Sequence, residues 1–537
     1  MAEPPAGVQW RVTGTYVLTG SQDGTARVWT AANGKQQQLE SRQMTDHPIS
    51  PTAARERATL ERAAELALAF LGSLDAAPVC ATTTLAELRQ RFVRPLNDEG
   101  ADPVTVIDDL ARNVAGGLLG SAGGRFYGWV IGAGLPAALA ADWLTATWDQ
   151  NAGLYACGPA AAVVEEVCGT WLKDVLGLPA SASFALVTGC QMAHVTCLAA
   201  ARHAVLARAG WDVNRDGFAG APVIRVLTSS EVHGTMTRAV KLLGIGTSNM
   251  VVLPSDSQSQ LTSHVLGEAL SRERGRPVIV VLQAGDVNCG AFDPFPELIG
   301  LAHDAGAWVH IDGAMGLWCN TVPELRHLLA GAELADSWAT DGHKWLNVPY
   351  DCGYAFVAHP EHHRAGMEHH ASYLVHADDA RDQLDWTPEH SRRARGFATW
   401  AALRELGRSG LSDLVARCCR HAHDIVTRIG ALPGARVLCV PQINQGLVRF
   451  HDARAGATES DHDRRTDEVM AAINASGEAY FTGSTWRGMR CMRVSVSSWR
   501  TTAMDVDRAV AAAARAGTAA RDSTRAPADR RAGRGGA

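Results

Sequence analysis

Long hydrophobic runs and a strong excess of charge of either sign are both missing from this chain of 537 residues. The formal net charge is −6, from 50 Lys and Arg against 56 Asp and Glu, so the composition gives no sign of a nucleic-acid surface. The longest apolar runs are short, such as 278–282, whereas a membrane-spanning helix needs ~20 residues. The first residues, MAEPPAGVQWRV, lack the basic-then-apolar pattern of a secretion signal. We therefore expect a cytoplasmic protein with no membrane or nucleic-acid partner.

Cysteine pairs at redox or metal-binding spacing are missing as well. The twelve cysteines are scattered, no C-x-x-C occurs, and the neighbours Cys418 and Cys419 fall in a helical pattern. A chain of this length buries enough surface to fold without disulfides, and Cys and His do not cluster at zinc-ligand spacings. We therefore expect neither a disulfide framework nor a metal site, and we interpret the cysteines as small buried side chains.

Residues 1–50 differ from the rest of the chain. Two β-rich runs, TYVLTG at 15–20 and TARVWT at 25–30, flank SQDG, which ends in an Asp-Gly turn signal. This stretch resembles the last two strands of one WD-repeat propeller blade. We see no second copy, and one blade cannot bury its faces. We interpret 1–50 as a fragment with a linker; a hairpin that binds a partner is the alternative.

The remaining chain predicts an α/β body. Leu and Ala recur three and four residues apart from Arg55 onward, which predicts a helical segment over 51–150. Short apolar strands then alternate with helices, which favours a mostly parallel sheet covered on both faces. The expected strands are 184–187, 223–228, 250–253, 278–283 and 307–311, and the expected helices are 159–176, 191–209, 234–243 and 295–305. The expected parts are a large domain over 151–385, a small α+β domain over 386–516 with a helix break at Gly410, and a disordered Arg/Ala/Gly-rich tail over 517–537.

Three motifs hold polar groups directly after expected strands, where ligands of parallel sheets bind. They are AWVHIDGAMG at 307–316, DSWATDGHKWLNVPYDCG at 336–353 and TSSEVHGTMTR at 228–238. Each is weak alone, because an Asp at a strand end is often a cap and a Lys is usually a surface residue. In combination they are a strong signal.

With CGPAAAVVEEVCGTWLKDVLGLP before them and SRRARGFATWAALRELGRSGL after them, these motifs make residues 55–516 resemble the pyridoxal-phosphate-dependent decarboxylases of the aromatic-amino-acid/glutamate group. The resemblance implies an α/β protein of fold type I. Its large domain would have a mostly parallel seven-stranded sheet, followed by a small C-terminal α+β domain. It also implies pyridoxal 5'-phosphate as cofactor, an amino acid as the small-molecule substrate and a homodimer.

The implied reaction is decarboxylation of an L-amino acid to the amine and CO₂. Phe126, Tyr127 and Trp129 slightly favour an aromatic substrate, although core packing explains such residues equally well. Another lyase, an aminotransferase or an aldehyde-forming enzyme on the same fold remains an alternative. A non-catalytic interaction protein that uses the N-terminal hairpin is a further one.

The resemblance also implies the site residues. Lys344 would be the Schiff-base lysine, and a desolvated pocket would keep its amine partly neutral for attack on an aldehyde. Asp312 would face the pyridine nitrogen and keep it protonated. His233 would stack on the ring, and Ala314 and His343 would be further cofactor contacts.

The cofactor's phosphate would bind backbone N–H groups at a helix N-terminus, at Gly189, Cys190 and Gln191. Relatives usually carry small hydroxyl residues in this loop. Backbone donation survives Cys190 and Gln191, whereas one hydroxyl bond is in doubt.

Two further residues follow from the resemblance. Tyr373, in ASYL, lies 29 positions after Lys344 (373 − 344) and fits the loop tyrosine that is thought to reprotonate the substrate carbon in relatives. Relatives with Phe there make aldehydes, so Tyr373 argues for plain decarboxylation. We interpret Arg493, in RCMRVSVSS, as structural, because a strong ion pair with the leaving carboxylate would favour the ground state over the transition state.

Overall fold

The computed structural model describes residues 10–13, 16–20, 26–30, 36–37, 50–369 and 380–525. The chain divides into two compact units. One comprises Met1–Ala69 and Val93–Asn113, and the other comprises Phe70–Phe92 and Val114–Ala537. The second unit therefore takes up part of the segment 51–150 that the sequence predicted as one helical part.

The first unit contains a small antiparallel sheet. Its strands pair in sequence order and are β1 (Trp10–Thr13), β2 (Tyr16–Gly20), β3 (Ala26–Thr30) and β4 (Gln36–Gln37). The two β-rich runs predicted from the sequence are confirmed as β2 and β3. Most of α1 (Pro51–Ser73) and α3 (Pro103–Val114) also belong to this unit, where Arg62 Nε lies 2.6 Å from Asp108 Oδ1.

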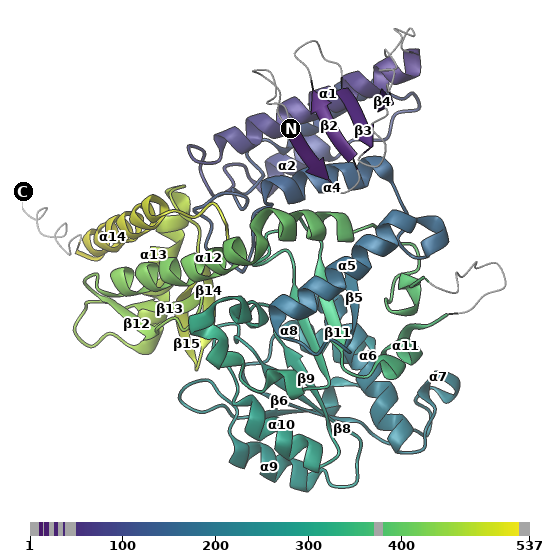
Figure 1. The fold of residues 1–537 in the computed structure, drawn as a ribbon. Coiled ribbons are helices and arrows are strands. Elements are labelled where there is room, and N and C mark those ends of the chain that lie inside the picture. Colours follow the sequence, from purple (N-terminus) through teal and green to yellow (C-terminus); the bar gives the residue numbers. More distant parts are fainter. Residues whose placement is uncertain are drawn as a thin grey trace, which may run out of the picture. The chain divides into compact units, whose positions relative to one another are not determined.

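A seven-stranded sheet forms the centre of the second unit (Figure 1). Its strands are β5 (Ser183–Val187), β6 (Arg225–Ser229), β7 (Met250–Leu253), β8 (Val278–Gln283), β9 (Trp308–Asp312), β10 (Ser337–Asp341) and β11 (Gly353–Val357). Their order is β5-β11-β10-β9-β8-β6-β7, and only β11 runs against the others. The predicted mostly parallel seven-stranded sheet is confirmed.

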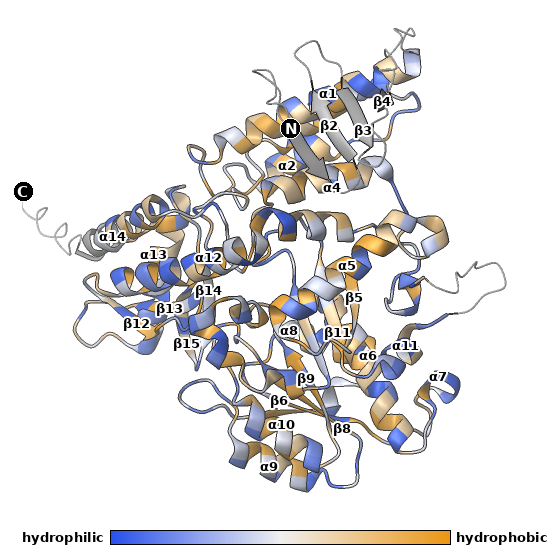
Figure 2. Cartoon of the chain, in the orientation of Figure 1, coloured by the Kyte–Doolittle hydropathy of each residue, from blue (hydrophilic) through white to orange (hydrophobic). Residues whose placement is uncertain are grey.

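Helices cover both faces of this sheet. They include α5 (Pro159–Leu176), α6 (Cys190–Arg208), α8 (Gly234–Leu242), α9 (Ser263–Arg272) and α10 (Phe295–Asp304). Strand β8 shows why the run 278–283 is wholly apolar until its last residue. Val280 and Leu282 belong to the hydrophobic cluster that includes side chains of α9 and α10, while Ile279 and Val281 belong to the cluster that includes side chains of α6 and α8. The central strands are accordingly among the most hydrophobic parts in Figure 2. Other helices of this unit are α2 (Leu85–Phe92), α4 (Pro136–Trp148), α7 (Val213–Asp216) and α11 (Pro360–Met367).

The C-terminal part has a second sheet of four antiparallel strands in the order β12-β13-β15-β14. These are β12 (Ala435–Cys439), β13 (Gln445–Phe450), β14 (Thr482–Trp486) and β15 (Met489–Ser495), with helices α12 (Gly396–Gly430), α13 (Glu459–Ala475) and α14 (Ala503–Arg525). The predicted break in the first helix occurs at Gly407, with φ 58°, and not at Gly410. The prediction of a disordered tail from 517 is wrong for 517–525, because α14 continues to Arg525. In the described part of the chain no helix is long and apolar enough to cross a membrane.

Candidate active site

A cavity of about 530 Å³ lies at the carboxyl ends of the parallel strands. It is lined by all eight residues predicted to contact the cofactor: Gly189, Cys190, Gln191, His233, Asp312, Ala314, His343 and Lys344. Tyr373, the ninth predicted site residue, lies outside the described residues. The sheet topology explains the convergence, because Asp312 ends β9, Gly189 follows β5 and His233 follows β6.

The ammonium group of Lys344 pairs with a carboxylate that sequence analysis did not single out. Lys344 Nζ lies 3.0 Å from Asp341 Oδ2, at the end of β10. Burial lowers the pKa of Lys344, but the attraction of Asp341 and Asp312 outweighs it, so the net shift is upward. The expectation of a partly neutral amine is therefore wrong for this arrangement, because the pocket is desolvated but also anionic.

Covalent loading of the cofactor should consequently accelerate as pH rises, since only the neutral amine attacks an aldehyde. Asp341→Asn removes the nearest negative charge and should lower the pKa of Lys344. Loading at neutral pH should then be faster by about tenfold for each pKa unit lost. Stopped-flow absorbance after mixing with pyridoxal phosphate measures this rate. An equal or slower rate in the variant would show that Asp341 does not hold the amine protonated.

Asp312 is a buried carboxylate that lines the cavity. Its Oδ2 lies 3.4 Å from His194 Nε2, and its Oδ1 accepts a hydrogen bond from Ala314 N at 3.2 Å. Burial raises the pKa of Asp312, but His194, His233 and Lys344 lower it more, so the net shift is downward. Asp312 is therefore ionised at neutral pH, as a partner of a protonated ring nitrogen must be.

The loop before α6 presents a helix N-terminus to the cavity. Gly189 has φ 85°, which a residue with a side chain rarely adopts, and a Cβ on Gly353 would lie 2.3 Å from the Gly189 backbone. Cys190 N donates to Asp341 Oδ1 at 2.6 Å, and Gln191 Nε2 donates to Thr235 O at 3.2 Å. The backbone N–H group of Cys190 that was expected to bind the phosphate is present, but it also donates to the Asp341 carboxylate.

His233 and His343 both line the cavity. His233 Nδ1 accepts a hydrogen bond from Thr235 N at 3.2 Å and so caps α8. Desolvation lowers the pKa of His233, which favours its neutral form. His343 stacks on Tyr350, with ring centroids 4.2 Å apart, and its Nδ1 donates to Cys352 O at 3.0 Å.

Sequence analysis missed several residues that line the cavity, among them Gln283, Asp341 and Tyr350. Arg493 also lines it, although it was interpreted as structural. Its Nη2 donates to Gln445 Oε1 at 2.7 Å and to Trp129 O at 3.2 Å. Burial lowers the pKa of Arg493 to about 10, so it remains a cation.

Asn347 fixes the loop that carries Lys344 and was also missed. This fully buried residue has φ 54°, and its amide nitrogen donates to Trp345 O and Ser497 O, both at 2.9 Å. Its Oδ1 accepts from the backbone of Ala133 at 3.1 Å. The lysine loop is thus tied to the small domain and to the segment before α4.

The cavity fits pyridoxal phosphate on the chemistry of its own groups. It offers an amine at Lys344, a buried carboxylate at Asp312 and a helix N-terminus for a phosphate. Gln283 lines it as well and has a buried amide nitrogen without a hydrogen-bond partner among the described residues. Across residues 87–452 the sequence matches the model of the pyridoxal-dependent decarboxylase conserved domain.

The chain belongs to the pyridoxal-dependent decarboxylase family. It is therefore a pyridoxal-phosphate-dependent enzyme that decarboxylates an amino acid.

Known proteins support this family assignment. The decarboxylase is 25% identical over 406 residues to an aromatic-L-amino-acid decarboxylase of Bacillus atrophaeus, covering 74% of this chain and 82% of the relative. It is 27% identical over 410 residues to a phenylacetaldehyde synthase of a Rosa hybrid cultivar, covering 73% and 80%. A crystal structure of Oryza sativa TDC with PLP and tryptamine superposes with a TM-score of 0.82 at 24% identity, covering 87% of this chain and 98% of that one. The superposition confirms the fold-type-I architecture.

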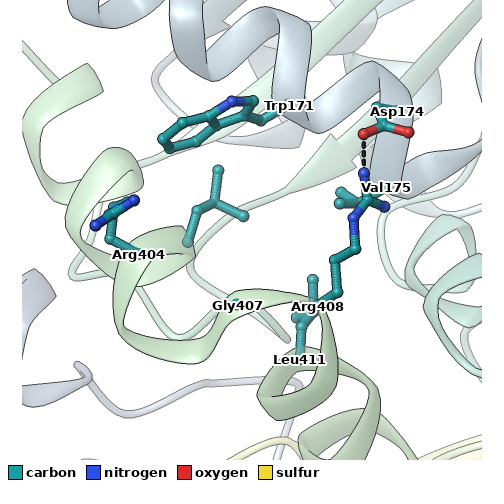
Figure 3. Close-up of a pocket in the computed structure, with 8 residues that line it drawn as sticks. Trp171, Asp174, Val175, Arg404, Gly407, Arg408 and Leu411 are labelled. Atoms are coloured by element: carbon teal, nitrogen blue, oxygen red, sulfur yellow. Dashed lines mark hydrogen bonds and ion pairs between the residues drawn. The ribbon is translucent and has the colours of Figure 1, made fainter.

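A second cavity of the decarboxylase, about 310 Å³, lies between α5 and α12 (Figure 3). Trp171 and Asp174 come from α5, and Arg404 and Arg408 come from α12 next to the break at Gly407. Asp174 and Arg408 form an ion pair across it. None of the predicted site residues lines this cavity, so the chemistry belongs to the first one.

Proposed function

We propose that this decarboxylase converts an aromatic L-amino acid to the corresponding amine and CO₂, with Lys344 as the residue that binds the cofactor covalently. The observation that carries the proposal is that Lys344 and Asp312 line one cavity together with the N-terminus of α6. When bound, pyridoxal phosphate supplies a ring that accepts the electron pair left on the substrate carbon as CO₂ departs.

Each residue has a defined part in this proposal. With pyridoxal phosphate bound, the buried Asp312 carboxylate would hold the proton on the ring nitrogen, and the neutral His233 would contact the ring. Backbone N–H groups at Cys190 and Gln191 bind the phosphate, with His343 beside them. Tyr373 donates the proton that replaces CO₂ on the substrate carbon, which would yield an amine instead of an aldehyde.

The aromatic preference rests on a cluster of rings that includes Trp129, which lines the cavity. Trp129 lines the cavity and lies 5.9 Å from Tyr480, which stacks on Phe126 with ring centroids 4.9 Å apart. The names of several relatives, which include tryptophan and tyrosine decarboxylases, support the same class. The relatives also include aldehyde synthases, so an aldehyde is the alternative product.

A decarboxylation screen tests the function directly. The holoenzyme is incubated with each common amino acid, and CO₂, amine, aldehyde and keto acid are measured. We expect the highest kcat/KM with an aromatic amino acid and one amine for each CO₂. Aldehyde with ammonia would move the protein to the aldehyde-forming class, and keto acid without CO₂ would contradict decarboxylation.

We further propose a homodimer. Helix α1 contains no buried residue in the single chain, and its Leu60 and Leu68 side chains are 61% and 63% exposed. Apolar surface of this kind usually marks an interface.

Twelve unpaired thiols support a cytoplasmic location, where thiols stay reduced.

The double substitution Leu60→Glu and Leu68→Glu should convert the dimer to a monomer and abolish most turnover. Obligate interfaces bury more than ~2,000 Å² and tolerate buried charges poorly. Light scattering measures the mass, with Arg55→Glu on the same helix as the charged control. A wild-type chain that is monomeric and fully active at micromolar concentration would contradict the proposal.

We also propose that residues 1–50 are a WD-repeat-like fragment that the enzyme does not need. Among the residues that the structure describes, strands β1–β4 pair only with one another. The unpaired edges of such a small sheet invite aggregation. Deleting residues 1–44 should leave cofactor binding and turnover within about twofold of the full chain, and should raise solubility. Loss of activity or dimerisation would identify the sheet as an integral part of the enzyme.

A further inference from the structure

A chain of buried polar side chains leads to Asp312, which lines the cavity, from four residues that are not part of its lining. Trp308 Nε1 donates to Ser337 Oγ at 2.9 Å, and Ser337 Oγ lies 3.0 Å from His310 Nδ1. His310 Nε2 lies 3.0 Å from His194 Nδ1, and His194 Nε2 lies 3.4 Å from Asp312 Oδ2. Apart from Asp312, which is 5% exposed, all of these residues are fully buried. The decarboxylase roles proposed above use none of the four residues behind Asp312.

The donor and acceptor properties of these side chains favour one direction for the series of hydrogen bonds. An indole nitrogen can only donate, so Ser337 Oγ accepts from Trp308 and its own proton is free to go to His310 Nδ1. His310 then carries its proton on Nε2 and donates it to His194 Nδ1. His194 in turn carries its proton on Nε2, facing Asp312. Burial lowers the pKa of His310 to about 3, so its ring is neutral and carries a single proton. This direction of the hydrogen bonds requires one proton on each ring.

The opposite direction fits less well. It would turn a lone pair of His194 Nε2 toward the Asp312 carboxylate, and that repulsion would be unscreened at full burial. It would also leave the hydroxyl proton of Ser337 without an acceptor among the residues that the structure describes. Cys190 Sγ lies 3.4 Å from His194 Nε2, but sulfur is a weaker acceptor than an anionic oxygen.

We propose that Trp308, Ser337, His310 and His194 form a one-way hydrogen-bond relay that fixes His194 as a donor to Asp312. The relay holds the Asp312 carboxylate ionised and oriented toward the cofactor ring. These four are positioning residues, because they act through Asp312 and do not touch the ring. The proposal rests on the proposed role of Asp312.

The first test measures the dissociation constant for pyridoxal phosphate in five variants: His194→Leu, His194→Gln, Ser337→Ala, Ser183→Ala and Asp312→Asn. His194→Leu removes the donor to Asp312 and should weaken binding by about tenfold. His194→Gln should restore most of the affinity, because its amide can accept from His310 and donate to Asp312. Ser337→Ala removes the hydroxyl that sets the direction and should weaken binding by about threefold.

Ser183→Ala is the matched control. Ser183 Oγ lies 2.8 Å from Nδ1 of the fully buried His363 in the same unit, and that pair has no link to Asp312. This variant should bind the cofactor like wild type. If His194→Leu and Ser337→Ala bind no more weakly than Ser183→Ala, while Asp312→Asn does weaken binding, the relay is refuted and the role of Asp312 stands. If Asp312→Asn also binds like wild type, the proposed function of Asp312 has failed instead.

A second measurement reads the proton positions and does not depend on affinity. Neutron diffraction from the deuterated holoenzyme should show deuterium on Nε2 of both His194 and His310, and on neither Nδ1. Deuterium on both Nδ1 atoms would overturn the relay.

A third measurement is the zinc content of the purified protein. The ligand atoms of Cys190, His194 and Asp312 lie within 4.8 Å of one another, a spacing that a metal ion could use. The relay predicts no stoichiometric zinc in the purified protein, because a metal-bound Nε2 carries no proton. One zinc per chain that is lost in His194→Leu would replace the relay with a metal site.

Discussion

Replacing Lys344 with alanine should lower turnover by about 10⁴-fold or more and remove the visible absorbance of the bound cofactor, because no other amine in the cavity can hold it. Lys344 is the lysine among the cavity residues, and its Nζ sits 3.0 Å from Asp341. The measurement combines steady-state CO₂ release with an absorbance spectrum of the purified variant. The alanine variant should still fold, since the loop around it is fixed by the side chain of Asn347.

Lys241→Ala is the matched control, because this lysine lies on α8 and is exposed outside the cavity. It should retain turnover and spectrum. If Lys344→Ala instead kept more than about a tenth of wild-type turnover, Lys344 would not be the covalent attachment site.

Asp312→Asn should be the second most damaging substitution, lowering turnover by about 10²- to 10⁴-fold with a smaller loss of cofactor affinity. Asparagine keeps the size of the side chain but cannot remain negative, so the ring nitrogen would lose the partner that keeps it protonated. Steady-state kinetics and a cofactor titration on the same preparation separate the two effects.

A buried aspartate elsewhere on the sheet provides the comparison. Asp336 accepts hydrogen bonds from His303 and His359 at 3.0 and 2.9 Å, and burial and histidine partners act on it as they do on Asp312. Asp336→Asn should lower stability without lowering turnover per folded molecule. Near-normal turnover in Asp312→Asn would remove Asp312 from the mechanism.

Much of the fold could be predicted because each signal was local. The strand 278–283 is a continuous apolar run, and helix 159–176 has proline at its start and glycine just past its end, and the structure places both elements at these bounds. Strands β10 and β11 were not predicted. SWATD lies inside the motif 336–353 and was interpreted only as part of it, and GYAFV begins at the last residue of that motif and was not singled out. The helical end of α14 was missed because its Arg and Ala lack a hydrophobic period, although both favour helix intrinsically.

The site was predictable wherever the order of motifs along the chain carried the signal, as for Asp312 and Lys344. What could not be predicted depends on contacts between distant segments. Asp341 reaches both Lys344 and the N-terminus of α6 only because β10 lies within the sheet. His194 meets Asp312 only because α6 packs on β9, and this required the sheet order that no local pattern encodes.

Borohydride reduction of the holoenzyme, followed by peptide mass mapping, tests the central claim most directly. The chain has only four lysines, Lys35, Lys173, Lys241 and Lys344, so the assignment is unambiguous. The account predicts that the reduced cofactor is found on the peptide containing Lys344 and on no other. Stoichiometric labelling of Lys35, Lys173 or Lys241, or no covalent label in a preparation that turns over, would contradict it.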